Sequence, residues 1–99
     1  MSAASYTFET QQDVLRLNAQ GDWSIAFVAL IDADLRRLAE PAGGLREAVI
    51  DLSGITRLDT SGAFVLDRTA TVFRSHGLRP RFEGMRDEHR LLIDKIAQL

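Results

Sequence analysis

Hydrophobic and polar residues alternate near the start of the chain. Every second residue of Val14–Leu17 is apolar, and the alternation continues to Ala19, as in a strand with one buried face. Tyr6–Glu9 is predicted to form an earlier short strand. The polar stretch 10–13 suits a hairpin between the two, although it contains neither Asn-Gly nor Asp-Gly. Gly21-Asp22 is expected to end the second strand.

The apolar spacing then lengthens to that of a helix. From Trp23 to Leu38 apolar residues recur three or four positions apart, which predicts an amphipathic helix. The apolar residues expected on its buried side are Phe27, Leu30, Ile31, Leu35 and Leu38. The polar residues expected to face away are Asp32, Arg36 and Glu40. The turn-forming stretch 41–44 should end this helix.

The second half of the chain repeats the change from strand to helix. Ala48–Leu52 is a short and nearly continuous apolar run, which favours a strand covered on both faces. A second helix is predicted from Ser61 to His76, where a glycine follows. Arg79–Glu83 predicts a strand that its proline restricts to an edge or a strand start. Arg86–Gln98 has the apolar spacing of a last helix.

The predicted order is therefore β-β-α-β-α-β-α. Strands joined through a helix run parallel with a right-handed crossover, whereas strands joined by a hairpin run antiparallel. This order predicts one small α/β domain over residues 1–99 with a mixed sheet. No capping residue follows the last helix, which leaves open that the chain is a fragment of a longer protein.

Composition narrows the classes of function. The 99 residues are 45% hydrophobic and 26% charged, which is typical of a single globular domain. The absence of cysteine excludes disulfides, thiol chemistry and cysteine-ligated metal. A net charge of -2 gives no general attraction to nucleic acid.

The chain is expected to be soluble and cytoplasmic. Its longest apolar-rich run, Ile25–Ile31, is far shorter than the ~20 residues that a membrane-spanning helix requires. Residues 1–6 lack the basic and apolar regions of a signal peptide. Direct insertion into a membrane is therefore not expected.

The junction before the second helix contains the side chains with the most candidate functional roles. Asp59-Thr60-Ser61-Gly62 follows a predicted strand and opens a helix. The first turn of a helix has free N–H groups and a partial positive charge. Asp59 and the two hydroxyls suit N-capping, which is the default interpretation. Gly62 would then mark a close approach of two backbones.

A second interpretation treats the outer side of this helix as a docking surface. The residues expected to face the sheet are Leu66, Thr69, Ala70 and Phe73. The residues that share a stripe away from it are Ser61, Phe64, Val65 and Arg68. A hydroxyl, an aromatic, an aliphatic group and an arginine together are typical of a protein-binding surface.

Phosphorylation of Ser61 would switch such a surface. A phosphate adds about -1.5 to -2 charge, which the helix N-terminus favours and Asp59 repels. The effect on folding should therefore be small, whereas a docked partner would meet a buried charge.

The segments Ile50–Gly54 and Leu58–Gly62, in this order of elements, resemble a STAS domain (sulfate transporter and anti-sigma factor antagonist) along essentially the whole chain. In anti-sigma factor antagonists, the serine before this glycine is phosphorylated by the partner anti-sigma kinase, and phosphorylation releases that partner. The resemblance therefore implies that Ser61 is the phosphorylated residue and Asp59 its acidic neighbour. It also implies a bacterial regulatory protein.

A second branch of the same family also fits. Gly21–Ser24, opening a helix that contains Leu30–Leu35, is similar to STAS domains of Mla-type lipid-transport ABC systems. There the implied partner is the transporter ATPase or permease, at the cytoplasmic face of the inner membrane. The hydroxyl of interest in that branch is the one that matches Thr60. Both hydroxyls are present, so the motif does not choose between the branches.

Other reactive side chains have simpler interpretations. His76 is expected to cap a helix C-terminus and His89 to pack half-buried. Two histidines without a regular ligand spacing do not predict zinc. Trp23 suits either ligand stacking or, by default, an anchor at the helix entry. No cofactor is expected.

An enzyme is the weakest of the three hypotheses. Asp32 and Asp34 should point to different sides of one helix, so they cannot share a proton. Asp51 and Asp59 would have to approach each other at the strand ends to act as a pair, and the favoured interpretation is that they are structural loop anchors. Ser61 has no histidine partner or nucleophile-elbow motif, and no phosphate-binding glycine motif is present.

Overall fold

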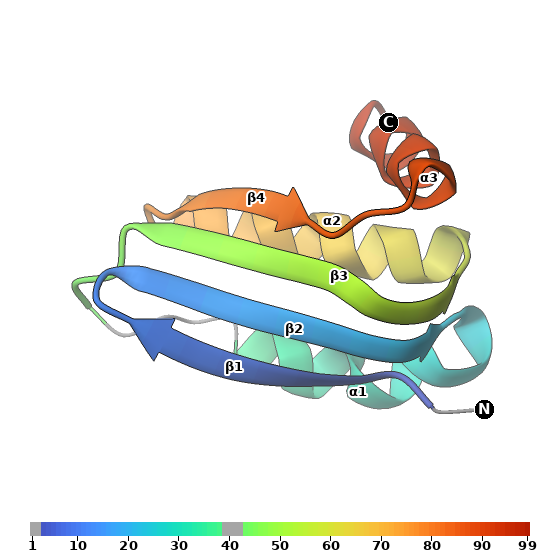
Figure 1. Cartoon of the computed structure of the whole chain (residues 1–99), viewed down its shortest axis with the longest axis horizontal. Helices are drawn as coiled ribbons and strands as arrows, with labels where there is room; N and C mark the ends of the chain where they lie inside the picture. Colours follow the sequence, from blue (N-terminus) through green and yellow to red (C-terminus); the bar gives the residue numbers. More distant parts are fainter. Residues whose placement is uncertain (1–2, 39–42) are drawn as a thin grey trace.

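Strands and helices follow the predicted order in the computed structural model, which describes residues 3–38 and 43–99 (Figure 1). The strands are β1 (Ser5–Gln11), β2 (Val14–Trp23), β3 (Glu47–Leu58) and β4 (Arg79–Glu83). The helices are α1 (Ile25–Leu38), α2 (Thr60–Ser75) and α3 (Asp87–Ala97). The predicted α/β class and the β-β-α-β-α-β-α order are confirmed.

One mixed sheet carries the fold, in the strand order β1-β2-β3-β4. The hairpin partners β1 and β2 are antiparallel, whereas β2–β3 and β3–β4 are parallel, as their helical connections require. Helices α1 and α2 lie side by side on one face, and α3 lies beside α2 (Figure 1). Because α1 and α2 each follow a parallel strand, their N-termini lie at the same edge of the sheet.

The two central strands are longer than predicted. Gly21 and Asp22 do not end β2, which runs to Trp23, and β3 continues past Leu52 to Leu58. Irregularities in the β2–β3 register fall at Asn18/Gln20 and at Gly21/Asp22, and Gly21 has a φ of 84°. Glycine therefore allows a bulge here instead of a break.

The apolar residues of Ala48–Leu52 are buried on both faces of the strand, as predicted, and Asp51 is half-buried. Helices cover one face only (Figure 1). Val49 points to the other face, yet it is 1% exposed. Its register neighbours on β2 and β4 are Arg16 and Arg81, whose long aliphatic stems suit covering an apolar side chain.

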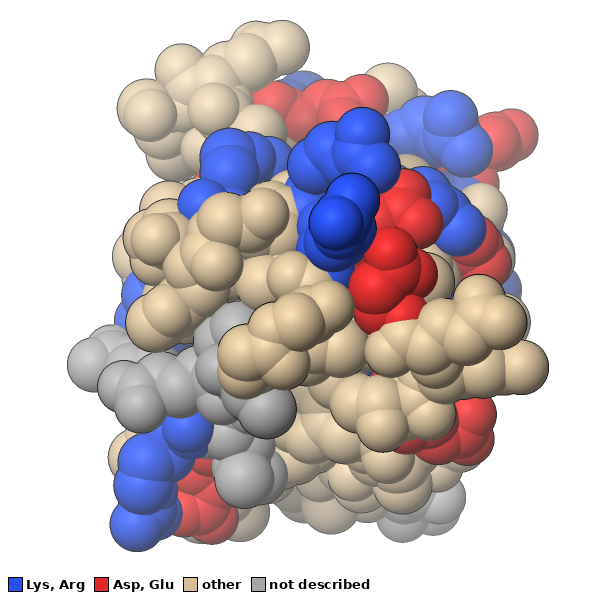
Figure 2. Space-filling model, turned by 90° about the vertical axis from the view of Figure 1, so that its left-hand side faces the viewer, with Lys and Arg blue, Asp and Glu red and all other residues tan. Residues whose placement is uncertain are grey.

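The open face of the sheet is charged and internally paired. Arg16 contacts Asp51 at 2.7 Å and Glu83 at 3.4 Å. The Ser53 backbone N–H, followed by the Arg16 guanidinium, holds the pKa of Asp51 below its usual value. At the end of the molecule that carries the β1–β2 turn, blue and red side chains also lie next to one another (Figure 2), so that end has no single sign of charge.

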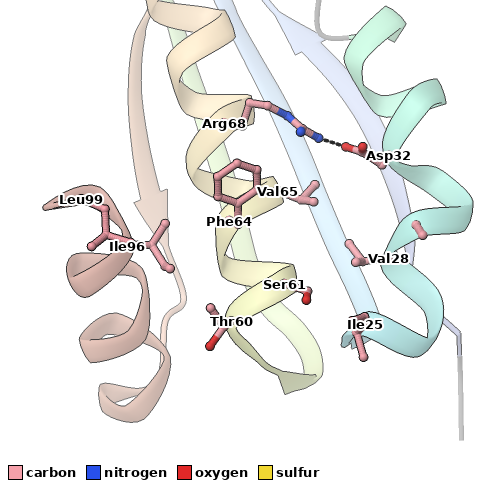
Figure 3. A pocket seen from close by; sticks show the side chains of 11 residues that line it. Ile25, Val28, Asp32, Thr60, Ser61, Phe64, Val65, Arg68, Ile96 and Leu99 are labelled. Atoms are coloured by element: carbon pink, nitrogen blue, oxygen red, sulfur yellow. Dashed lines mark ion pairs between the residues drawn. The ribbon is translucent and has the colours of Figure 1, made fainter.

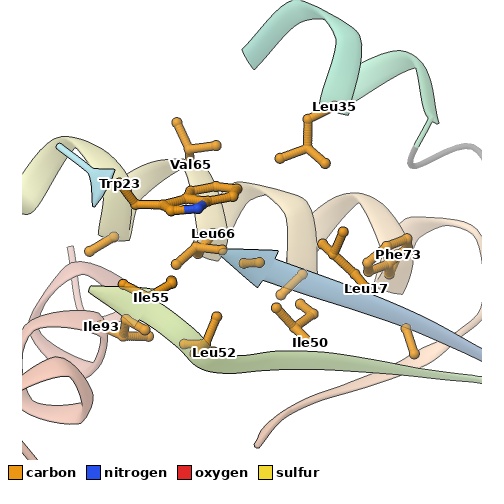
Figure 4. Close-up of a cluster of buried hydrophobic side chains, with 14 of the residues drawn as sticks. Leu17, Trp23, Leu35, Ile50, Leu52, Ile55, Val65, Leu66, Phe73 and Ile93 are labelled. Carbon is orange, nitrogen blue, oxygen red and sulfur yellow. The ribbon is translucent and has the colours of Figure 1, made fainter. Parts of the chain in front are cut away.

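The core fills the space between the sheet, α1 and α2 (Figure 4). Trp23 and Phe73 are fully buried. The Trp23 indole N–H donates to the Gln20 carbonyl at 2.8 Å. Trp23 is thus a core residue at the end of β2, and the ligand-stacking interpretation is wrong.

Helix α1 buries a different set of residues from the predicted one. Val28 and Leu35 are buried, Phe27 and Ile31 are half-buried, and Leu30 is 75% exposed. The predicted positions that lie outside the described residues or side chains are Arg36, Leu38, Glu40 and the first two residues of the 41–44 turn.

The other helix ends agree closely with the predictions. Helix α2 ends with His76 as its C-cap, and Gly77 follows with a φ of 86°, the conformation that glycine tolerates best.

Helix α3 buries His89, which is 6% exposed instead of half-buried. Pro80 lies in the edge strand β4, as expected for a residue without an N–H.

Candidate functional site

The N-terminal end of α2 is built around Asp59. Its side chain accepts a hydrogen bond from the Gly62 N–H at 3.0 Å, which confirms the predicted N-cap. Its other oxygen accepts from the Ile25 N–H at 2.9 Å. One carboxylate therefore satisfies a free donor in the first turn of two different helices.

The two hydroxyls of this junction differ in access. Thr60 is exposed, whereas Ser61 is half-buried and points toward the gap between α2 and α1 (Figure 3). Both residues thus keep surface that is exposed to solvent. Gly62 is buried, and a Cβ atom added there would overlap the Trp23 carbonyl oxygen.

An open groove of about 520 Å³ runs beside these hydroxyls. Helices α1, α2 and α3 supply its walls (Figure 3). The apolar residues that line it are Ile25, Val28, Ala29, Phe64, Val65, Ile96 and Leu99. The polar lining consists of the junction hydroxyls and the side chains of Asp32 and Arg68. The groove is thus an apolar surface with a hydroxyl-bearing end.

The predicted docking stripe divides into exposed and buried members. Phe64 is 52% exposed, which confirms that it points away from the sheet. Arg68 lies 5.4 Å from the centre of the Phe64 ring, within cation–π range. Val65 is only 6% exposed and forms part of the groove floor, so its placement in an exposed stripe is wrong.

Arg68 pairs with Asp32 across the groove (Figure 3). Asp32 was expected to face away from the core, but α1 turns it toward α2. Burial lowers the pKa of Arg68 from its usual value. The pair links the two helices two turns beyond Ile25 and Ser61.

Two exposed apolar residues belong to this surface but lie outside the predicted stripe. Ile25 is 72% exposed and Leu99 is 98% exposed, and both line the groove. Ile25 is the first helical residue of α1 and was not assigned to an apolar face, whereas Leu99 continues the predicted i, i+4, i+7 spacing of Leu92 and Ile96 just beyond α3. Only the packing of three helices brings them together.

The other candidate groups remain separate. Asp51 lies mid-strand with Arg16, whereas Asp59 caps α2, so each carboxylate has its own structural partners, in agreement with the favoured interpretation. Asp34 pairs with Arg37 at 2.6 Å, away from Asp32 as predicted. Within residues 3–38 and 43–99, no cluster of histidine and acidic side chains is arranged to hold a metal ion.

None of the described helices is long and apolar enough to cross a membrane.

The Nδ1 atom of buried His89 has no hydrogen-bond partner among the described residues. Burial, and then the charge of Arg86, lowers the pKa of this imidazole, while Glu88 opposes the shift. The packing of α3 thus favours the neutral form of His89.

Comparison with known proteins places this arrangement in context. A family model described as "Mlab, STAS domain" matches residues 6–96. A search of curated protein sequences found no match.

Several solved structures share the fold. The unphosphorylated anti-sigma factor antagonist SpoIIAA is 12% identical, with a TM-score of 0.67 over 91% of this chain and 82% of its own. The antisigma-factor antagonist STAS domain from Rhodobacter sphaeroides is 24% identical, with a TM-score of 0.68 over 85% of this chain and 89% of its own. The murine anion transporter Slc26a9 is 11% identical, with a TM-score of 0.70 over 88% of this chain but 14% of its own.

Proposed function

This chain belongs to the Mlab-type STAS domain family, and on that premise we propose that it is a non-enzymatic regulatory module that binds a partner protein. The proposed contact surface is the predicted one, whose members are Asp59, Thr60, Ser61, Gly62, Phe64, Val65 and Arg68. Because Gly62 and Val65 are buried, they support this surface from beneath.

The apolar groove beside the Ser61 hydroxyl is the observation that carries this proposal. Phe64 and Ile25 expose large apolar side chains at its rim. Such side chains add little to the core of a single domain, but their burial by a partner would remove apolar surface from water. The proposed ligand is therefore a protein with an apolar contact segment.

Phosphorylation of Ser61 is the proposed switch, and Thr60 is the alternative position. Ser61 points toward the groove (Figure 3), so a phosphate there would put a dianion against an apolar partner. Desolvating that charge without a paired cation is unfavourable. The nearest cation lining the groove, Arg68, is already paired with Asp32.

Affinity capture from the source cell tests both parts. Ser61→Ala should retain the captured partner, whereas Ser61→Asp should lose it. Thr60→Asp, the neighbouring charge change, shows which hydroxyl controls binding. Equal capture by Ser61→Ala and Ser61→Asp would remove Ser61 from the switch.

The identity of the captured protein separates two versions of this function. In the first, an anti-sigma kinase is the partner, as the fold shared with SpoIIAA suggests. In the second, the ATPase or permease of an Mla-type lipid-transport system is the partner, which the family description favours. The second version places the domain at the cytoplasmic face of the inner membrane through its partner.

A further inference from the structure

We propose that Asp59 is a positioning residue that ties α1 to α2 and carries a charge change at Ser61 to α1. This inference rests on the proposed function, because the two helices form the groove walls. The Asp59 carboxylate uses one oxygen for each helix, toward Gly62 N–H at 3.0 Å and Ile25 N–H at 2.9 Å. An ordinary N-cap serves only its own helix.

Two polar links set the spacing of the groove walls. Asp59 joins the helices at the hydroxyl end, and the Asp32–Arg68 pair joins them at the other. Ile25 to Asp32 and Ser61 to Arg68 each span two helical turns, which is about 10 Å. The lining between these links is mostly apolar, so no other hydrogen bond described between α1 and α2 fixes their separation there.

A negative charge on Ser61 would disturb the first link. Ser61 is two residues beyond Asp59, and an anion there competes for the N–H groups of the first turn. It also repels the Asp59 carboxylate. Gly62 belongs to the helix that Asp59 caps, whereas Ile25 belongs to the separate helix α1. The bond to Ile25 is therefore the one that is lost, and the first turn of α1 moves. The switch thus changes the shape of the groove as well as its charge.

The variant Asp59→Asn separates this role from ordinary capping. Asparagine caps helices about as well as aspartate, but it has one acceptor oxygen in place of two. It therefore keeps one of the two bonds. In a nuclear magnetic resonance experiment on the free domain, the Ile25 amide should exchange with water about tenfold faster, while the Gly62 amide stays protected. Resonances of the first turn of α1 should shift.

Asp67→Asn is the matched control, because it makes the same charge change on α2 at a position without a capping bond. It should leave both amides as in the wild type. Wild-type exchange of Ile25 in Asp59→Asn, or resonance shifts confined to α2, would overturn the inference.

A second measurement tests the transmission of charge. Ser61→Glu should speed exchange of the Ile25 amide in the domain alone, whereas Ser61→Ala should not. An unchanged Ile25 amide in Ser61→Glu would overturn the transmission even if partner capture is lost. Conversely, if the amide responds but no partner is captured by any variant, the proposed function fails and the link between the helices stands.

Discussion

At the scale of single residues, Gly62 shows how closely the site is tied to the core. A Cβ atom at this position would overlap the Trp23 carbonyl oxygen and press on the Leu58 side chain. We therefore expect Gly62→Ala to lower the free energy of unfolding by about 3 kcal/mol. Gly43→Ala, which meets no atom within 4 Å, should change it by less than about 0.5 kcal/mol. Urea denaturation compares the two; equal losses would mean that Gly62 has room.

Phe64 represents the opposite case, a large side chain with a small role in folding. It is 52% exposed, so Phe64→Ala should leave the melting temperature almost unchanged. The same substitution should weaken binding of the captured partner by ~1–3 kcal/mol, as for an interface anchor. Leu66→Ala, on the buried side of α2, is the control and should lower stability by ~2–5 kcal/mol. A similar loss of stability in Phe64→Ala would contradict its outward placement.

At the scale of elements, α3 buries a histidine, His89, against the core. The pKa of buried His89 is lowered, first by burial, so the unfolded chain takes up its proton at a higher pH than the folded chain does. Its contribution to stability is present above pH 6.5 and is lost as pH falls through the lower, folded value. We expect the melting temperature to fall between pH 7 and pH 5, and to fall less in His89→Gln.

Thermal unfolding followed by circular dichroism at several pH values provides the measurement. His76→Gln, at the exposed C-cap of α2, is the control and should retain the pH dependence of the wild type. If the melting temperature of His89→Gln depended on pH as strongly as that of the wild type, groups other than His89 would cause the loss of stability in acid.

Elements were easiest to predict where one local signal dominates. Arg79–Glu83 has the predicted bounds, and Gly77 ends α2 as expected. The hairpin between β1 and β2 has no glycine, and Gln12 instead adopts a φ of 56°. The lengths of β2 and β3 were missed because pairing between neighbours continues through Gly21, which local propensity alone assigns to a break.

At the scale of the whole molecule, the candidate site was only half predictable. The Asp59 cap and the exposure of Phe64 follow from local capping chemistry and helical spacing. The groove does not, because it requires α1, α2 and α3 to meet. The turning of Asp32 toward Arg68 likewise depends on how α1 rotates. The hydrophobic spacing predicted a buried side that includes Leu30, whereas Val28 and Leu35 enter the core.

The two faces of the sheet also differ in chemical character. Helices and an apolar groove lie on one side of the sheet, and the paired charges around Asp51 lie on the other. The pKa of Asp51 is lowered in the folded protein, first by the Ser53 N–H. Its contribution to the free energy of unfolding is therefore present above about pH 4 and is lost as pH falls through the pKa of the folded state. Asp51→Asn should therefore be less stable than the wild type at pH 6.

This difference should shrink toward pH 2, because protonation of Asp51 in the wild type removes the same charge. Equilibrium urea denaturation at pH 6, 4 and 2 measures the difference in unfolding free energy between the two proteins. Asp94→Asn, on the exposed side of α3, should show no such convergence. Partner capture at pH 7 should be equal for Asp51→Asn and the wild type, since the groove lies across the sheet from this network. Loss of capture would instead assign the open face of the sheet to partner binding.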